Sequence, residues 1–344
     1  MPTASIDLFL ASSAMILMVV GAIYGVNLAV EPYLGGYSAN LERYWQIERY
    51  MVLSTGEPEN WGVEGAPTAL GFASNGGAYE LDIDKVTRLN PSNAYALNYS
   101  QLWVAFGIED VSFRIRVDTL FNLTLSLASS QLQGGNTTYT FNASTTRRGY
   151  PLPADVRYYV AVRDFTDSIT GTTDIDGFGT VEFSLPNSLN GTALLTGFAR
   201  VEESVVSYSV LPFAHNSAPP WPAGIFATLS PHNYTLNVDL TEGASVMNAA
   251  VFSLGYMFNL MGDGDSYEIP RLLDASPMVL ALTGSNGSSY WAEWAAYPQV
   301  PLAVGAGMSD ANAFSDVASV LYLVEVKGAL YRFEVRFRSL VEDD

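Results

Sequence analysis

Residues 6–30 read IDLFLASSAMILMVVGAIYGVNLAV, an apolar segment that contains one acid, Asp7, and no base. As an α-helix this segment would be about 37 Å long, enough to cross a bilayer core of roughly 30 Å. Its side chains are apolar on every side, and such a helix must be buried all round, by lipid or by protein. We therefore expect residues 1–34 to form a long hydrophobic N-terminal helix, with Asp7 stabilising its positive end.

A cleaved signal peptide fits this segment poorly. Signal peptides have a basic start and an apolar stretch of roughly 7–15 residues, whereas here no Lys or Arg precedes Arg43. Two alternatives remain, a membrane anchor and a helix that packs against copies of itself. Small residues allow close helix packing, and the predicted packing residues are Ile6, Phe9, Leu10, Ala14, Leu17, Met18, Gly21 and Gly25.

A second, amphipathic helix is expected just after this segment. Pro32 and the pair Gly35-Gly36 should end the first helix. Ser38 suits an N-cap, and apolar residues follow at partial helical spacing over 39–53. We assign residues 35–55 to an amphipathic connecting helix, which would link an apolar core to a solvent-exposed outer shell. An ordinary helix packed on a β-domain would show the same pattern.

The remainder predicts short strands separated by turns. Stretches such as SFRIRV (112–117), VRYYVAVRD (156–164) and GTVEFSL (179–185) are typical of strands. The proline-rich stretch HNSAPPWPAG (215–224) reads as a linker. The expected fold class is therefore mainly β with a long N-terminal α-helix: two immunoglobulin-like β-sandwich domains, residues 56–214 and 219–344, on a hydrophobic helical stalk.

The last strands have the clearest pattern. In the stretch SVLYLVEVKGALYRFEVRFRSL, Lys327-Gly328 is placed at the turn of a hairpin. After that turn Phe333, Val335 and Phe337 alternate with Arg332, Glu334 and Arg336. One face is apolar and the other charged, as in a half-buried antiparallel strand.

Composition narrows the possible functions. The formal net charge is −19, from 35 acids and 16 bases, and only 15% of the chain is charged. Nucleic acid is a poor partner at that charge. There is no cysteine, which excludes disulfides, thiolate catalysis and Cys-ligated zinc. The uncharged polar surface that this composition implies suits an extracellular protein.

No catalytic motif is recognisable. The two histidines, His215 and His232, stand in no HExxH or HxH pattern, and there is no GxSxG, P-loop or Rossmann glycine run. We expect no enzyme activity and no cofactor. A secreted carbohydrate-active enzyme, which needs only two carboxylates in a cleft, is kept as an outlying alternative.

Two acidic loops offer oxygen ligands, although we predict no metal site. Asp174 and Asp176 can hold calcium, but the sequence favours an Asp-Gly turn between two strands there. Asp263, Asp265 and Glu268 form a second acidic group, without the spacing of an EF-hand.

Sequons for N-linked glycans are more frequent than the roughly three that chance predicts for this composition. They occur at Asn98, Asn122, Asn136, Asn142, Asn190, Asn233 and Asn286. All lie after residue 90, which fits a displayed, glycosylated β-shell. The alternative is that Asn and Thr are simply common in turns and edge strands.

An apolar N-terminal helix followed directly by an acidic, Thr/Asn-rich β-region resembles archaeal type IV pilins and archaellins. The resemblance covers residues 1 to about 55, and LSTGEPENWG with YELDIDKVTRLN further resembles archaeal pilin-like proteins. It implies a segment that sits in the membrane before assembly and in the filament core afterwards. Two features depart from the family. Prepilins carry a short basic leader, so either a leader was removed upstream of Met1 or the chain is not processed as a pilin. Bacterial pilins have Glu where this sequence has Ser5.

These features together predict a structural subunit of an archaeal extracellular filament, used for adhesion. Its partners would be its own copies, the membrane before assembly, and N-linked glycans. The alternative is a monomeric, membrane-anchored cell-surface protein that displays the same β-domains.

Overall fold

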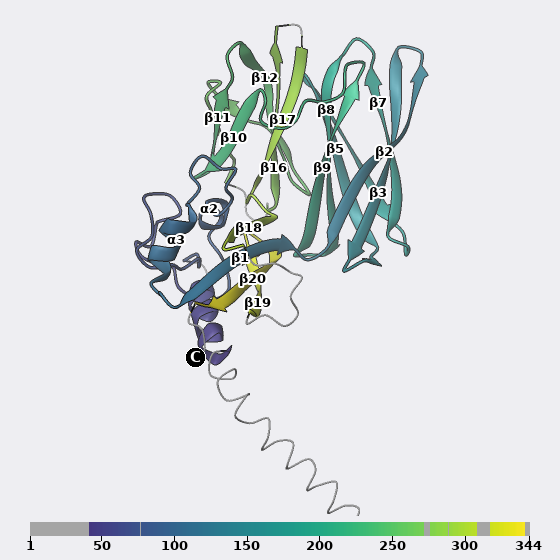
Figure 1. Ribbon diagram of the computed structural model, residues 1–344. Helices are drawn as coiled ribbons and strands as arrows, with labels where there is room; N and C mark the ends of the chain where they lie inside the picture. The colour runs from purple at the N-terminus through teal and green to yellow at the C-terminus, as the bar shows by residue number, and fades with distance from the viewer. Residues whose placement is uncertain (1–40, 76, 272–275, 288, 308–316, 341–344) are drawn as a thin grey trace, which may run out of the picture. The chain divides into compact units, whose positions relative to one another are not determined.

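The computed structural model describes residues 41–75, 77–271, 276–287, 289–307 and 317–340 (Figure 1). Contacts divide the chain into two units, Met1–Arg49 and Tyr50–Asp344, and the account below concerns the second. The predicted stalk, residues 1–34, lies outside the described residues, and so does every residue predicted to pack in a filament core.

The helices among the described residues are short. They comprise one over residues 41–53, α2 (Ile83–Thr87) and α3 (Tyr99–Phe106). A capping box between Asn98 and Gln101 opens α3, and Gly107, in the left-handed conformation with φ 68°, ends it. In the described part of the chain, no helix is long and apolar enough to span a membrane.

Two antiparallel sheets enclose the first core. Sheet 1 contains β2 (Asn122–Gln133), β3 (Asn136–Arg147), β4 (Tyr150–Pro151) and β7 (Phe178–Pro186), and sheet 2 has the order β6 (Phe165–Thr173), β5 (Ala154–Val162), β8 (Gly191–Glu202), β9 (Val205–His215). Every second side chain of these strands points inward. Phe141 and Phe183 of sheet 1 share this core with Tyr158 and Leu195 of sheet 2, all of them buried.

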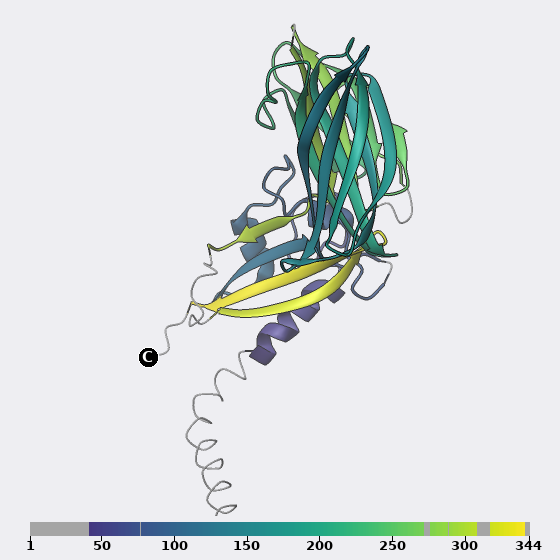
Figure 2. The same ribbon diagram turned by 90° about the vertical axis from the view of Figure 1, so that its right-hand side faces the viewer.

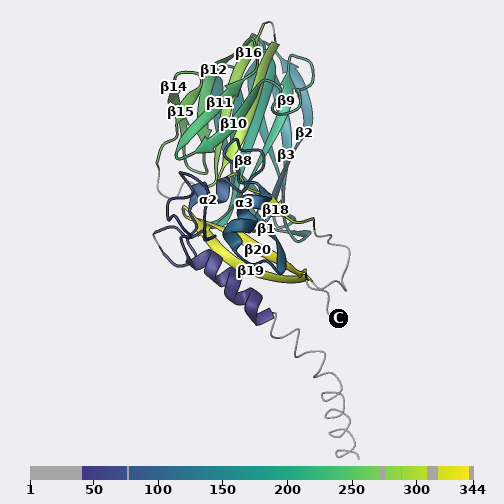
Figure 3. The same ribbon diagram turned by 60° about the vertical axis from the view of Figure 1, so that its left-hand side comes forward.

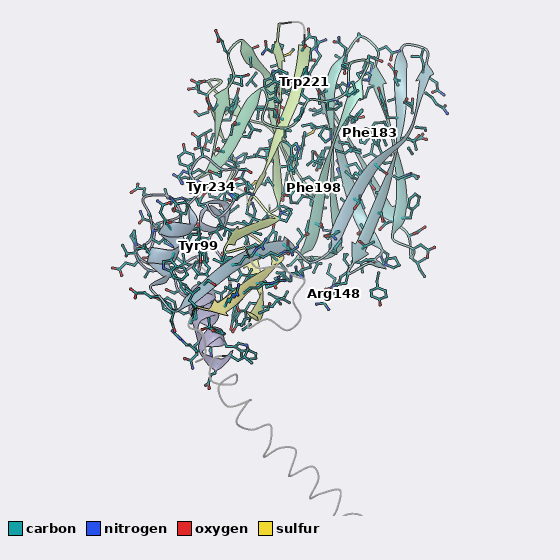
Figure 4. The ribbon with its side chains drawn as sticks, viewed as in Figure 1. Tyr99, Arg148, Phe183, Phe198, Trp221 and Tyr234 are labelled. Carbon is teal, nitrogen blue, oxygen red and sulfur yellow. The ribbon has the colours of Figure 1, made fainter. Side chains whose placement is uncertain are left out.

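Sheet 2 is covered on its other face as well. Sheet 3 has the order β13 (Met257–Asn259), β12 (Ala244–Phe252), β16 (Met278–Asn286), β17 (Ser289–Tyr297). Tyr159 and Phe198 of sheet 2 pack against Phe252 and Val279 of sheet 3. Figure 4 labels Phe183 and Phe198, which belong to the cores on the two sides of sheet 2. Because both of its faces are buried, sheet 2 is the central layer.

Sheet 4 forms a further layer on sheet 3. Its order is β10 (Ala227–His232), β11 (Thr235–Leu240), β15 (Ser266–Glu268), β14 (Met261–Gly262). The ring of Phe226, just before β10, stacks on Trp291 of β17 at a centroid distance of 6.0 Å. The layers therefore follow one another in the order sheet 4, sheet 3, sheet 2, sheet 1, as Figure 1 shows from left to right.

A fifth sheet, the base sheet, lies at the lower end of these layers (Figure 2). Its order is β18 (Leu302–Gly305), β1 (Val111–Thr119), β20 (Ala329–Ser339), β19 (Val317–Val326). Phe113 of β1 packs against Phe106 of α3 at 4.5 Å between ring centroids. On the opposite face Asp118 accepts bonds of 2.6 Å from both Arg116 and Arg332.

These sheets show that the predicted fold class, a long N-terminal helix carrying two immunoglobulin-like domains, is wrong. The described helices are short, and the strands form five connected sheets. β1 lies between β18 and β20, so strands from the two ends of the β-region share one sheet. The prediction failed because apolar periodicity reports which face of a segment is buried, but not the segment that covers it.

Candidate glycan-bearing surface

The outer face of sheet 1 is the face that points away from sheet 2. Side chains alternate between the two faces of a strand, and Tyr139, Phe141 and Ala143 of β3 are buried. The side chains between them point outward. The outward set comprises Asn122, Thr124, Ser126, Ser129, Gln131 and Gln133 of β2, Asn136, Thr138, Thr140, Asn142, Ser144 and Thr146 of β3, and Phe178, Thr180, Glu182, Ser184 and Pro186 of β7.

Three predicted glycosylation sites share this face. Asn122 and Asn136 are exposed and Asn142 is half-buried. In each sequon the Ser or Thr lies two residues further on, so the strand period places its hydroxyl on the same face as the asparagine amide. Asn142 lies opposite Ser126 on one side and Thr180 on the other, and both side chains are small. All three asparagines are thus at least partly exposed, as the attachment of an N-linked glycan requires.

The outer face of sheet 1 is nearly without charge. Glu182 is the single acid in the outward set, and it accepts a hydrogen bond of 3.2 Å from the Thr140 hydroxyl. The hydroxyls of Thr138 and Ser184 lie 3.4 Å apart. In a chain with a net charge of −19, this face presents hydroxyl and amide groups instead of carboxylates.

The other four sequons lie at turns and caps elsewhere. Asn98 is the N-cap of α3, Asn190 precedes β8, Asn233 lies in the turn between β10 and β11, and Asn286 ends β16. Asn98, Asn190 and Asn233 are exposed and Asn286 is half-buried. The oxygen of Asn98 accepts from the backbone N–H of Gln101 at 2.9 Å, which leaves its amide nitrogen free of that bond.

The turn at Asn233 is tied to a buried carboxylate that sequence reasoning missed. The backbone N–H of Asn233 donates to Oδ1 of Asp84 at 2.7 Å, and so does the Tyr297 hydroxyl, also at 2.7 Å. Asp84 has 3% of its surface exposed. Burial raises the pKa of Asp84 above its usual 3.8, and the two hydrogen bonds offset the rise only in part.

Two cations of the same helix region are buried too. Lys85 donates from Nζ to the carbonyls of Thr55 and Ala73 at 2.8 and 3.0 Å, and burial lowers the pKa of this amine. Arg88 donates to the carbonyls of Tyr95 and Trp61. These charges are held by backbone carbonyls from distant segments, so they fasten the loops before α3 to α2.

The two acidic loops are shaped by their own backbone bonds. Asp174 accepts from the backbone N–H groups of Asp176 and Phe178 at 3.0 and 2.9 Å, in the turn between β6 and β7. Asp263 accepts from the N–H groups of Asp265 and Ser266, and these bonds lower its pKa. In the portion of the chain that the structure describes, no three His, Asp or Glu side chains are grouped so as to hold a metal ion.

The histidines occupy structural positions. His215 is fully buried, with Nδ1 2.9 Å from the Tyr139 hydroxyl and Nε2 3.0 Å from the carbonyl of Pro186. The ring of His232 stacks on Tyr95 at 4.3 Å, and Nε2 lies 3.1 Å from the carbonyl of Gly62.

Two grooves lie away from sheet 1. One of about 990 Å³ runs past Asp155, Arg157, Arg200 and Tyr256. Arg200 and Asp155, on neighbouring strands, form a long ion pair there, with 3.9 Å between the guanidinium nitrogen and the carboxylate oxygen. The other, of about 620 Å³, is lined by Tyr234, Asp263 and Arg271, and the Arg271 guanidinium lies 4.5 Å from the centre of the Tyr234 ring.

Comparisons with known proteins find little. No protein-family model and no curated protein match this chain. Among solved structures, human GIVD cytosolic phospholipase A2 is similar at a TM-score of 0.14 and 10% identity, over 69% of this chain and 34% of that one. The same human enzyme in complex with methyl gamma-linolenyl fluorophosphonate inhibitor and terbium chloride gives 0.15 and 8%, over 67% and 33%. This chain thus spans about a third of the length of those chains. At these scores the similarity carries no argument about fold or activity.

Proposed function

We propose that this protein is a structural subunit of an extracellular filament similar to archaeal type IV pili. In this proposal the β-sheets form the outer shell, and the outer face of sheet 1 carries N-linked glycans. The apolar segment 6–30 supplies contacts between copies, without any particular secondary structure assumed for it. The role is structural and adhesive, not catalytic.

The observation that carries the proposal is the gathering of Asn122, Asn136 and Asn142 on one nearly uncharged face. Exposed sheet surfaces usually rely on charged side chains to remain soluble and separate. This face has one carboxylate, Glu182, and one exposed aromatic ring, Phe178, and most of its other side chains are hydroxyls and amides. Glycans on the three asparagines would hydrate the face in place of charges.

Spacing on the face supports glycans at more than one site. Asn136 and Asn142 are about 20 Å apart along β3, at about 3.4 Å per residue. Asn122 lies on the neighbouring strand, where its partner is Thr146. Each glycan would therefore occupy its own part of the sheet.

The test is mass spectrometry and electron microscopy of the protein from the cells that produce it. We expect glycopeptides at Asn122, Asn136 and Asn142, and filaments in negative stain. A variant with all three asparagines changed to Gln should still assemble, but without the carbohydrate mass on these peptides. Unmodified peptides at all three sites would overturn the glycan surface. Separate particles that stay bound to membranes would overturn the filament in favour of a membrane-anchored monomer.

A further inference from the structure

β19 (Val317–Val326) is the terminal strand of the base sheet (Figure 3), and its outer edge is paired only in part among the described residues. In an antiparallel strand, alternate residues direct both N–H and C=O to the same side. The backbone N–H and C=O of Glu325 point away from β20. The N–H donates to the carbonyl of Tyr79, and the C=O accepts from the N–H of Leu81. Ser319, Leu321 and Leu323 have the same parity and therefore direct their backbone groups to the same open side.

Among the residues that the structure describes, those that cover this edge lie at its Glu325 end. The bridge between Glu80 and Glu325 pairs residues 79–81 with the strand end. Within the described ranges of the chain, no backbone group bonds to the outward N–H and C=O of Ser319, Leu321 or Leu323. The edge thus offers a row of donors and acceptors to another strand.

The side chains along this edge favour association. Leu321 and Leu323 are 46% and 54% exposed, on the same face of the sheet. No charged residue occurs from 317 to 324, although the chain has 51 charged residues, 35 acids and 16 bases. Proteins usually protect open edges with charges, prolines or bulges, and the stretch 317–324 contains neither a charge nor a proline.

We propose that the open edge of β19 pairs with β19 of a second copy, antiparallel and about a two-fold axis near Ser319 and Leu321. A two-fold axis perpendicular to the sheet leaves Leu321 and Leu323 of both copies on one face, where they bury each other. The pairing gives hydrogen-bond partners to the open backbone groups of both β19 strands at once, and it leaves no new open strand edge. Residues 79–81 limit the overlap, because they already occupy the edge at Glu325.

The net charge of the chain also favours the β19 edge as the contact between copies. With a net charge of −19, two copies repel each other over most approaches, and repulsion is weaker at an edge without charged residues, such as this one. Salt screens such repulsion, with a Debye length of about 8 Å at 0.15 M. The β19 contact should therefore become tighter as ionic strength rises. The second copy comes from the proposed homopolymer, so in that respect the inference rests on the proposed function.

Single cysteines test the pairing cleanly, because the chain has none of its own. Residues opposite each other in a strand pair have Cβ atoms about 4.5–5.5 Å apart, within reach of a disulfide. A two-fold axis between Ser319 and Leu321 places residue 319 of one copy opposite residue 321 of the other. We expect a mixture of full-length Ser319→Cys and Leu321→Cys to form mixed covalent dimers under mild oxidation, at least about tenfold faster than Val104→Cys forms dimers. Val104, on α3, is 73% exposed and serves as the control. Equal rates for the mixture and for Val104→Cys would overturn the pairing.

A charge variant provides a second measurement that does not depend on oxidation. Leu321→Lys makes the chain less acidic, so net charge alone predicts stronger association, whereas an edge contact predicts at least about a tenfold higher dimer dissociation constant. Val104→Lys makes the same charge change on α3, away from any sheet edge, and should leave the constant within about twofold. Association unchanged or strengthened by Leu321→Lys would contradict the proposal.

Failure of this inference differs from failure of the proposed function. Filaments that form unchanged with Leu321→Lys, and show no cross-link at 319 or 321, would overturn the β19 pairing and leave the filament standing. Cross-linked dimers without any filament would support the pairing and count against the filament.

Discussion

The hydroxyl of Tyr297 on β17 donates a hydrogen bond of 2.7 Å to the carboxylate of Asp84 on α2. These residues are far apart in the chain and both are buried. The bond joins the short helices to sheet 3, and the N–H of Asn233 adds sheet 4 to the same carboxylate. One buried carboxylate thus links three parts of the fold.

Removal of the Tyr297 hydroxyl should destabilise the protein measurably. In Tyr297→Phe, the buried carboxylate of Asp84 loses one of its two donors, at a cost of about 1.5–3 kcal/mol for a bond to a charged group. Urea denaturation measures the loss. Tyr150→Phe is the control, since Tyr150 is 75% exposed, and its free energy of unfolding should change by less than about 0.5 kcal/mol. Equal effects of the two variants would contradict this role.

Asp84 should also make stability depend on pH. Because burial raises its pKa above the ordinary 3.8, the folded protein holds a proton just above that pH which the unfolded chain has lost. Stability from this group therefore falls as the pH rises through the window between the unfolded and folded pKa values, and then levels off. The free energy of unfolding of the wild type, minus that of Asp84→Asn, should show this fall in urea titrations at a series of pH values. A difference that grows with pH would mean a lowered pKa instead.

Gly284 should tolerate no side chain. It lies opposite Trp291 in the pair of β16 and β17, and an added Cβ would lie 2.1 Å from the indole ring and 2.3 Å from the carbonyl oxygen of Ser245. Gly284→Ala should lower the free energy of unfolding by about 1–3 kcal/mol, because the core must shift to make room. Thermal and urea denaturation measure the change. Gly135→Ala, with open space around it, should be within about 0.5 kcal/mol of the wild type.

The sequon at Asn142 gives a site-specific test of the glycan surface. Ser144→Ala removes the hydroxyl that the N-x-Ser sequon requires, so we expect the peptide containing Asn142 to lose its glycan while those containing Asn122 and Asn136 keep theirs. Ser126→Ala is the matched control, since Ser126 lies opposite Asn142 on the same face but belongs to no sequon. Loss of the glycan with Ser126→Ala, or its retention with Ser144→Ala, would contradict sequon-directed modification at this site.

The sequence pattern of the last strands predicted one part of the base sheet, the hairpin of β19 and β20. The hairpin at Lys327-Gly328 is confirmed, with β19 and β20 paired in register and positive φ angles of 48° and 85° at the turn. Phe333, Val335 and Phe337 are buried as the alternation predicted. A turn of this kind and a period of two are local properties, so neighbouring residues determine both.

The arrangement of the sheets and the charged cluster could not be predicted in this way. Asp84, Lys85 and Arg88 have the composition of a solvated helix, yet all three are buried, because their partners come from distant segments such as Tyr297 and Thr55. The outward face of sheet 1 depends likewise on β3 lying between β2 and β7. Sequons are local, but their convergence on one face follows from strand order, which periodicity does not report.

The place of β1 in the base sheet has a consequence for how the protein is made. β1 (Val111–Thr119) has β20 (Ala329–Ser339) as its long neighbour and the short β18 on its other side. During synthesis β1 therefore emerges some two hundred residues before the strand that completes its hydrogen bonds. Such distant pairing delays folding, and the base sheet closes only after β20 has been made. Until then β1 stays without its long neighbour, and the base sheet is incomplete.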